Sequence, residues 1–115
     1  MVERITRDEL KAKLDRGDAV TLVEALPRRY FEDGHLPAAV NLPHDQVEAL
    51  AARLLPDRAA EIVVYCANTP CPNSAVAAGR LVRLGYARVR EYVEGKQDWV
   101  EAGYALEKGA ARAAA

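Results

Sequence analysis

The run Glu61-Ile62-Val63-Val64-Tyr65-Cys66 most constrains the fold, because it is short, almost wholly nonpolar and rich in β-branched residues. It is the strongest strand signal in the chain. A second run, Ala19–Glu24, is also short and apolar and ends in a charge. Such runs without polar alternation are typical of strands buried on both faces of a parallel sheet. The sequence therefore predicts strands that lie inside a layered α/β fold.

A capping box predicts the first helix. The Thr6 hydroxyl and the Glu9 carboxylate stand three residues apart, so that each can bind an unpaired amide of the other residue. Ile5 and Leu10 stand where a hydrophobic staple packs, and Gly17 ends the helix. The chain is therefore expected to enter its first helix at Thr6.

Strands and helices alternate along the rest of the chain, which predicts parallel βαβ units in one sheet. Residues 1–107 form a single domain in this interpretation, and the Ala-rich tail 108–115 is expected to be frayed or disordered. The remaining predicted elements are a helical turn at Arg28–Glu32, an extended piece at Val40–Leu42, a helix opened by Asp45 and Glu48 and closed at Pro56-Asp57, a helix from Ser74 to Leu84 capped by Asn73 or Ser74 with Gly85 past its end, a strand at Val89–Val93 and a helix at Lys96–Ala102.

Charge and composition argue against two classes of partner. Lys and Arg number 16 against 17 Asp and Glu, so the formal net charge of −1 provides no basic stripe for nucleic acid and no polybasic patch for a membrane. No run approaches the length of a membrane span, and the amino terminus begins with charges. We therefore expect a cytoplasmic protein. Two cysteines make no disulfide scaffold, and in a reducing compartment they are buried, metal-binding or reactive.

Cys66 is the candidate reactive residue. It is the last residue of the most apolar predicted strand, and ligands of parallel sheets collect at the carboxyl ends of strands. The loop after it leads into a helix, whose first amides and dipole favour a negative charge and lower the pKa of a thiol. This position predicts an anionic sulfur nucleophile. The alternative is a buried and inert thiol.

The loop after Cys66 carries no charge and is stiffened by two prolines, so that it can direct several backbone amides at one sulfur. A merely structural turn is the alternative. The residues expected to bind substrate, through backbone amides where these exist, are Ala67, Asn68, Thr69, Pro70, Pro72, Asn73 and Ser74.

The order and spacing of several segments resemble the rhodanese-like family over nearly the whole chain. Each segment is a weak signal alone, but the set is specific. The matching segments are Leu22-Val23-Glu24-Ala25, Tyr30, the run from Gly34 to Pro43 that is close to the family's Gly-His-Ile-Pro-Gly-Ala, Val63-Val64-Tyr65-Cys66, Ser74-Ala75 with Ala77-Ala78, Gly85-Tyr86, Gly95, Trp99 and Ala102-Gly103.

The resemblance implies a five-stranded, mainly parallel sheet flanked by helices on both faces. It also implies a sulfurtransferase in which Cys66 takes a sulfane sulfur from a small-molecule or protein donor, holds it as a persulfide and passes it to a thiophilic acceptor. No cofactor and no metal are expected, because the sulfur travels on the protein. The loop amides would stabilise the charged sulfur as they would an oxyanion.

Three departures from the family pattern bear on the sulfur donor. Glu24-Ala25-Leu26 stands where the family commonly has Asp-Val-Arg, although Arg28 and Arg29 follow. The loop from Cys66 to Ser74 is longer than the family's commonest version and lacks its usual Arg or Lys. Without that cation, thiosulfate, a dianion, is a poor candidate for the natural donor, and a protein or low-molecular-weight persulfide is favoured.

Cys71 lies on the same loop, five residues after Cys66. It is predicted either to act as a resolving thiol, which attacks the persulfide or closes a disulfide, or only to pack against the loop.

Other candidate ligands receive structural interpretations. His35 is a candidate general base, but the resemblance implies that it belongs to a structural turn and bonds backbone. His44, beside Pro43 and Asp45, is expected to be a surface or cap residue. The two histidines and two cysteines match no compact zinc motif. Trp99 and Tyr104 are expected in the core. Four arginines are expected on solvated faces, with contact to an acidic partner as the alternative: Arg80, Arg83, Arg88 and Arg90.

Two other functions stay open. A thiol phosphatase or arsenate reductase also places a Cys before a helix, but it needs an Arg at the end of the loop, where this chain has Pro72. A non-catalytic binding or regulatory module with the same fold is the second alternative, and the retained Cys66 argues against it.

Overall fold

The computed structural model describes residues 2–110 and contains one five-stranded sheet in the order β1-β5-β4-β2-β3. Every strand pair of this sheet is parallel, which confirms the predicted α/β class. The strands are β1 (Glu3–Arg4), β2 (Val20–Glu24), β3 (Val40–Asn41), β4 (Glu61–Tyr65) and β5 (Arg88–Tyr92). β4 lies at the centre of the sheet, so the strand with the most apolar sequence takes the most covered position.

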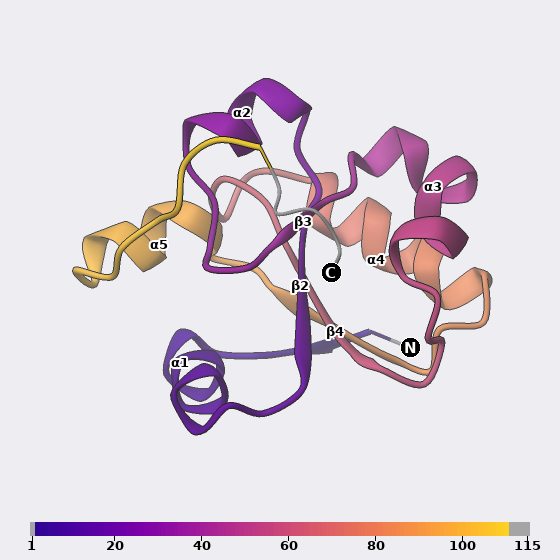
Figure 1. The fold of residues 1–115 in the computed structure, drawn as a ribbon, viewed down its shortest axis with the longest axis horizontal. Helices are drawn as coiled ribbons and strands as arrows, with labels where there is room; N and C mark the ends of the chain where they lie inside the picture. Colours follow the sequence, from indigo (N-terminus) through magenta and orange to yellow (C-terminus); the bar gives the residue numbers. More distant parts are fainter. Residues whose placement is uncertain (1, 111–115) are drawn as a thin grey trace.

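Helices cover both faces of the sheet. Figure 1 shows α3 and α4 on one side and α1 and α5 on the other. The helices are α1 (Arg7–Arg16), α2 (Arg28–Asp33), α3 (Val47–Leu54), α4 (Asn73–Arg83) and α5 (Gly95–Glu101), with a 3₁₀ turn, η1 (His44–Gln46), before α3. Within the described residues, no helix is both long enough and apolar enough to cross a membrane.

The start of α1 confirms half of the predicted capping box. The Thr6 hydroxyl accepts a hydrogen bond from the Glu9 amide at 3.1 Å, and Gly17 ends the helix in the left-handed conformation at φ 77°. The Glu9 carboxylate does not reach back to Thr6. It accepts two hydrogen bonds from the Arg90 guanidinium instead, at 2.9 and 3.1 Å, because a cation outcompetes a neutral amide for a carboxylate.

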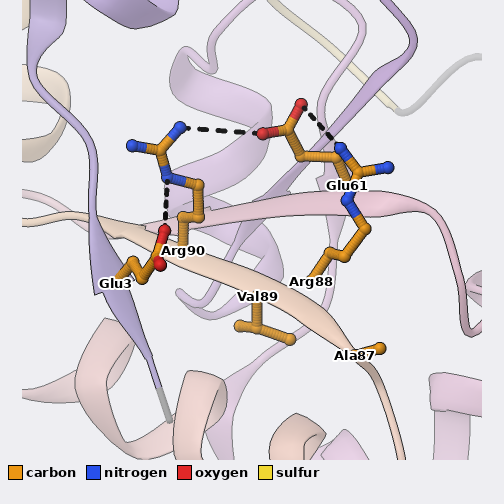
Figure 2. Close-up of a pocket in the computed structure, with 6 residues that line it drawn as sticks. All are labelled: Glu3, Glu61, Ala87, Arg88, Val89 and Arg90. Carbon is orange, nitrogen blue, oxygen red and sulfur yellow. Dashed lines mark ion pairs between the residues drawn. The ribbon is translucent and has the colours of Figure 1, made fainter.

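Arg90 is therefore not on a solvated face, and that prediction was wrong. Its side chain is only 18% exposed and pairs with Glu9, Glu3 and Glu61. Arg90, Glu3 and Glu61 line a hollow of about 320 Å³ at the amino ends of β4 and β5. Figure 2 shows these three side chains and their ion pairs. Arg88, at the rim of this hollow, has a 60% exposed side chain, as expected.

The beginnings of α3 and α4 differ from the prediction. α3 begins at Val47, after η1, and neither Asp45 nor another side chain caps it. α4 begins at Asn73, with Pro72 at its N-cap and no side-chain cap. The sequence placed the cap at Asn73 or Ser74, but both residues lie inside the first turn, and the Ser74 hydroxyl binds a side chain from another strand.

β1 is an element that the sequence pattern did not predict. Its two residues are charged and exposed, so they carry no hydrophobic signal. They pair with Arg90 and Glu91 of β5, and the Ile5 amide continues the ladder to the Glu91 carbonyl at 3.0 Å. Backbone pairing with an existing strand is enough to order this segment.

Side chains of the central strands alternate between two cores. On β4, Ile62 and Val64 face α3 and α4, whereas Val63 and Tyr65 face the opposite cluster that contains Trp99. Trp99 is 1% exposed and contacts Tyr104 edge-on, which confirms the prediction that both pack in the core.

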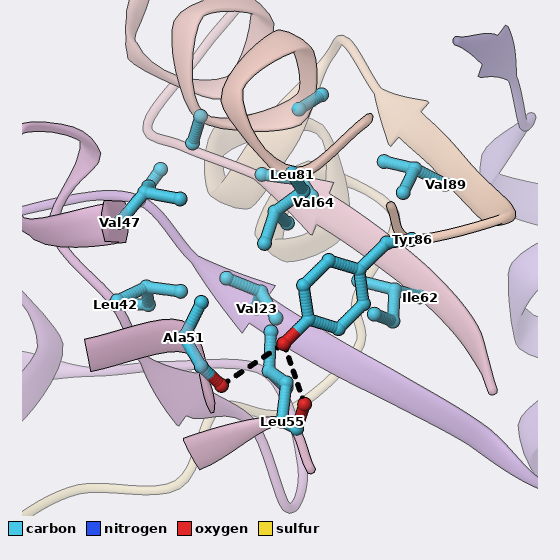
Figure 3. Packing of buried hydrophobic residues seen from close by; sticks show 13 residues of the cluster. Val23, Leu42, Val47, Ala51, Leu55, Ile62, Val64, Leu81, Tyr86 and Val89 are labelled. Carbon is cyan, nitrogen blue, oxygen red and sulfur yellow. Dashed lines mark hydrogen bonds between the residues drawn. The ribbon is translucent and has the colours of Figure 1, made fainter. Parts of the chain in front are cut away.

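Figure 3 shows the cluster on the α3 and α4 side. Within this cluster, the Tyr86 hydroxyl lies within hydrogen-bond distance of two backbone carbonyls, those of Leu55 at 2.6 Å and Ala51 at 3.1 Å. A side chain outside α3 thus satisfies carbonyls at the end of that helix.

The end of the described chain folds back onto α2. Glu107 forms an antiparallel bridge with His35, and the Gly109 amide donates to the Glu32 carbonyl at 2.8 Å. Most of the predicted tail, residues 111–115, lies outside the described residues.

Candidate active site

Cys66 follows the last residue of β4, one residue beyond the strand end, and is completely buried. By the alternation of the strand it belongs to the face that α4 covers, because Ile62 and Val64 point to that side. The loop 67–72 leads from Cys66 directly into α4. The sulfur therefore lies at the carboxyl end of the central strand and beside the beginning of a helix, as the sequence indicated.

A disulfide joins Cys66 to Cys71, so both cysteines of the chain meet on this loop. Their Cα atoms are 6.5 Å apart. The Cys71 amide donates to the Asn68 carbonyl at 3.1 Å, which forms a turn that brings Cys71 back toward Cys66. Cys71 is half-buried whereas Cys66 is inaccessible, so the two sulfurs differ in their exposure to solvent.

A serine and a glutamate adjoin the sulfur of Cys66. Its Sγ lies 3.4 Å from Oγ of Ser74, and the Ser74 hydroxyl donates to Oε2 of Glu91 at 2.7 Å. Glu91 comes from β5 and shares the face of Val89. In the reduced protein, this arrangement lets a Cys66 thiol donate a hydrogen bond to Oγ of Ser74, while the Ser74 hydroxyl still donates to Glu91.

Glu91 was missed by the sequence analysis. The sequence signal that could have identified it is the position of its carboxylate, on the same face of β5 as the core residue Val89. Such a residue needs a polar partner when half-buried, and Ser74 in the first turn of α4 supplies it.

The loop residues predicted to bind substrate lie around the disulfide with unequal exposure. Ala67 and Asn68 are half-buried, Thr69, Pro70 and Pro72 are exposed, and Asn73 begins α4. Within residues 66–74 no loop amide donates to Cys66 Sγ in this disulfide-bonded form; the 3.4 Å neighbour from the loop is the Cys71 carbonyl. Stabilisation of a charged sulfur by these amides stays a prediction for the reduced form.

The amino end of α5 fixes the backbone of Cys66. The Lys96 amide donates to the Cys66 carbonyl at 3.0 Å, and the Gln97 amide donates to the Ala67 carbonyl at 2.9 Å. Gly95 has φ 67°, and a Cβ at this position would collide with the Cys66 carbonyl oxygen. Only glycine allows α5 to approach this closely.

The side chain of Lys96 enters the opposite face of the sheet. It pairs with the fully buried Glu24 at 3.1 Å and donates to the carbonyls of Gly34 and Tyr30 at 2.8 and 3.0 Å. The Tyr65 hydroxyl also donates to Glu24, at 2.9 Å. Burial raises the pKa of Glu24 although Lys96 and Tyr65 oppose this, and burial next to Glu24 raises the pKa of Tyr65 well above its ordinary value. We call Glu24, Tyr65 and Lys96 the buried triad.

Both histidines lie in structural settings. His35 is buried, stacks on Phe31 and bonds the Phe31 carbonyl through Nδ1 at 2.8 Å, which confirms its predicted backbone hydrogen bond. His44 begins η1, and its carbonyl accepts from Arg80 at 2.9 Å. In the part of the chain that the structure describes, no three His, Cys, Asp or Glu side chains are grouped to hold a metal ion.

A profile of the rhodanese-like domain family matches residues 6–102, which is most of the chain. The match includes the cysteine after β4, the loop and the helix described above. The chain belongs to the rhodanese-like domain family.

The chain is also similar to individual proteins and solved structures. An HTH-type transcriptional regulator of Mycobacterium tuberculosis is 34% identical over 108 residues, which are 94% of this chain and 46% of the regulator. The rhodanese-like domain of an Anabaena protein superposes with a TM-score of 0.82 at 26% identity, over 100% of this chain and 86% of that one. A thiosulfate sulfurtransferase of Pseudomonas aeruginosa gives 0.83 at 28% identity, over 94% of this chain and 20% of the enzyme. This chain spans about half the length of the first curated relatives it matches.

Proposed function

We propose that this protein is a sulfurtransferase that carries sulfane sulfur as a persulfide on Cys66 and passes it to a thiophilic acceptor. The observation that supports it most is the position of Cys66, which lies at the carboxyl end of the central strand and directly before the loop into α4. The dipole of α4 favours an anionic sulfur there, and so do the free amides at the start of the helix. The proposal includes a cytoplasmic location, where reducing thiols keep cysteines free.

The transfer consists of two displacements at sulfur. The Cys66 thiolate attacks the outer sulfur of a donor persulfide, the bond from Cys66 to that sulfur forms, and the donor leaves as its thiolate. An acceptor thiolate then attacks the same outer sulfur, and Cys66 leaves as its thiolate. No net oxidation or reduction occurs, and no cofactor takes part.

The charges around the sulfur favour a donor other than thiosulfate. The loop 67–72 contains no cation, and the Glu91 carboxylate adjoins Ser74, which itself adjoins Cys66. A dianion would approach a negative group with no compensating Arg or Lys on the loop. The reacting group of a persulfide on a small thiol or on a protein carries at most one negative charge, so it fits this site better.

Mass spectrometry after reduction and incubation with glutathione persulfide tests the proposal. In Cys71→Ser, we expect Cys66 to gain one sulfur atom, and in Cys66→Ser we expect no gain. Ala75→Ser, at an exposed position of α4, serves as the control for adding a hydroxyl beside the site; combined with Cys71→Ser, it is expected to load Cys66 like Cys71→Ser alone. Absence of sulfur on Cys66 with persulfide, polysulfide and thiosulfate donors would overturn the transferase proposal.

A non-catalytic regulatory module is the second candidate. It is favoured by the 34% identity to a transcriptional regulator of which this chain covers 46%. The same experiment separates the two candidates, because a regulatory module that needs no sulfur chemistry leaves Cys66 unmodified by every donor.

A further inference from the structure

We infer that Cys71 resolves the persulfide on Cys66, so that the protein releases its sulfur as hydrogen sulfide and closes the Cys66–Cys71 disulfide. This inference rests on the proposed function, because it needs a persulfide on Cys66. It adds a second outcome for the bound sulfur, which is reductive release instead of transfer to an acceptor.

The observation that carries the inference is the disulfide itself. The turn from Asn68 to Cys71 brings Cys71 Sγ into bonding contact with Cys66 Sγ, while the Cα atoms of the two residues stay 6.5 Å apart, within the range of ordinary disulfides. Cys71 therefore reaches the inner sulfur of a Cys66 persulfide without any movement of β4 or α4. A thiol that only packed against the loop would not need this contact.

The resolving step balances as a thiol–disulfide exchange. The Cys71 thiolate attacks Sγ of the Cys66 persulfide, the bond between the two Sγ atoms forms, and the bond from Cys66 Sγ to the outer sulfur breaks. The outer sulfur leaves as hydrosulfide and is reduced, and the Cys71 sulfur is oxidised. Cys66 Sγ keeps its oxidation level. Hydrosulfide takes up a proton from solvent to give hydrogen sulfide.

A dithiol reductant must then reopen the disulfide, because a disulfide sulfur cannot accept a sulfane atom. In the disulfide-bonded form, Cys66 is inaccessible and Cys71 is half-buried, so the reductant meets the sulfur of Cys71. One thiolate of the reductant attacks Cys71 Sγ and Cys66 leaves as its thiolate. The second thiol of the reductant then displaces Cys71, and the reductant carries away the disulfide. The cycle thus consumes a persulfide and a dithiol and yields a thiol, sulfide and an oxidised dithiol.

A single-turnover measurement without reductant tests this step. Reduced protein, freed of reductant, receives less than one equivalent of glutathione persulfide, and free sulfide is trapped with monobromobimane. The parent is expected to release sulfide in proportion to the donor and to form the Cys66–Cys71 disulfide, at a rate independent of protein concentration. Cys71→Ser is expected to lose this release and to retain the added sulfur on Cys66. Ala75→Ser is expected to behave like the parent.

Two results would overturn the inference and leave the proposed function intact. One is a parent protein that keeps its sulfur on Cys66 and releases no more sulfide than Cys71→Ser. The other is movement of the added sulfur to Cys71, which shows attack on the outer sulfur. If Cys66 gains no sulfur in Cys71→Ser, the proposed function itself fails.

Discussion

The two faces of the sheet carry different kinds of polar group at the same end of the strands. On the α4 face, Cys66, Ser74 and Glu91 form a short chain in which Glu91 is half-buried and pairs with a neutral hydroxyl. On the α5 face, the buried triad places a fully buried carboxylate against a cation and a phenol. The first set places a negative charge near the Cys66 sulfur, whereas in the second set both carboxylate oxygens of Glu24 have hydrogen-bond partners.

Lys96 links the two faces. Its side chain belongs to the buried triad, while its backbone amide holds the carbonyl of Cys66. The difference teaches that the side chains of the buried triad stabilise the fold, whereas the proposed sulfur chemistry depends on the residues of the α4 face and on the backbone amide of Lys96. Substitutions on the two faces are therefore expected to separate stability from reactivity.

The largest effect is expected from Lys96→Met. It leaves the Glu24 carboxylate buried without its cation, so the free energy of unfolding at neutral pH is expected to fall by about 3 to 5 kcal/mol. The pKa of Glu24 is already raised by burial, and loss of Lys96 raises it further. Folding then favours the protonated form of Glu24. The free energy of unfolding therefore falls as pH rises from the pKa of Glu24 in the unfolded chain through its higher pKa in the folded protein. The difference in unfolding free energy between the parent and Lys96→Met should therefore be small in acid and grow toward neutral pH.

Urea unfolding at several pH values measures this prediction. Lys11→Met, which removes one partner of the exposed pair with Asp15, is the control and is expected to cost no more than about 1 kcal/mol. In a Cys71→Ser background, folded Lys96→Met is expected to load sulfur on Cys66 as Cys71→Ser alone does, since the backbone amide of residue 96 remains. A deficit that is the same at every pH would contradict the role given to Glu24.

The next effect is expected from Gly95→Ala, which acts on the link between the faces. A left-handed φ and a collision with the Cys66 backbone together are expected to cost on the order of 3 kcal/mol, or to push α5 away from the loop. Loading of Cys66 should fall in the same variant. Gly103→Ala, also at positive φ but with open space around its Cβ, isolates the backbone strain from the collision. Equal losses in the two variants would show that the collision is unimportant.

The smallest effect is expected from Glu91→Gln in a Cys71→Ser background. Removing a negative charge two hydrogen bonds from Cys66 favours the thiolate, so alkylation of Cys66 is expected to shift to lower pH by about one unit or less. Unfolding free energy should change little, because glutamine still accepts from Ser74. An unchanged alkylation profile combined with a large loss of stability would show that Glu91 stabilises the fold and does not affect the reactivity of Cys66.

The α/β class and the position of Cys66 at the carboxyl end of a buried strand could be predicted from local patterns. The apolar runs at β2 and β4 are buried as expected, Gly17 ends α1, and Cys66 stands after β4. A strand that is buried on both faces has a continuous run of nonpolar residues, which can be recognised in the sequence. The loop also placed two cysteines close enough in sequence for their contact to be anticipated.

The partners of the site could not be predicted in the same way. Ser74 meets Glu91, which lies on another strand, and Lys96 meets Glu24 across 72 positions of sequence. No local pattern records such a contact, because it arises only when the parallel sheet aligns the ends of β2, β4 and β5. The second half of the capping box was mispredicted for the same reason, because Arg90, which is distant in sequence, donates to the carboxylate of Glu9.

The two backbone amides that α5 donates to the Cys66 loop make the motion of this loop measurable by hydrogen exchange. The protons on Lys96 and Gln97 are held only while the carbonyls of Cys66 and Ala67 stay in place. Their hydrogen exchange therefore measures how often the loop detaches from α5. Comparison of the oxidised, reduced and sulfur-loaded forms by NMR would show in which chemical state this loop is held most firmly.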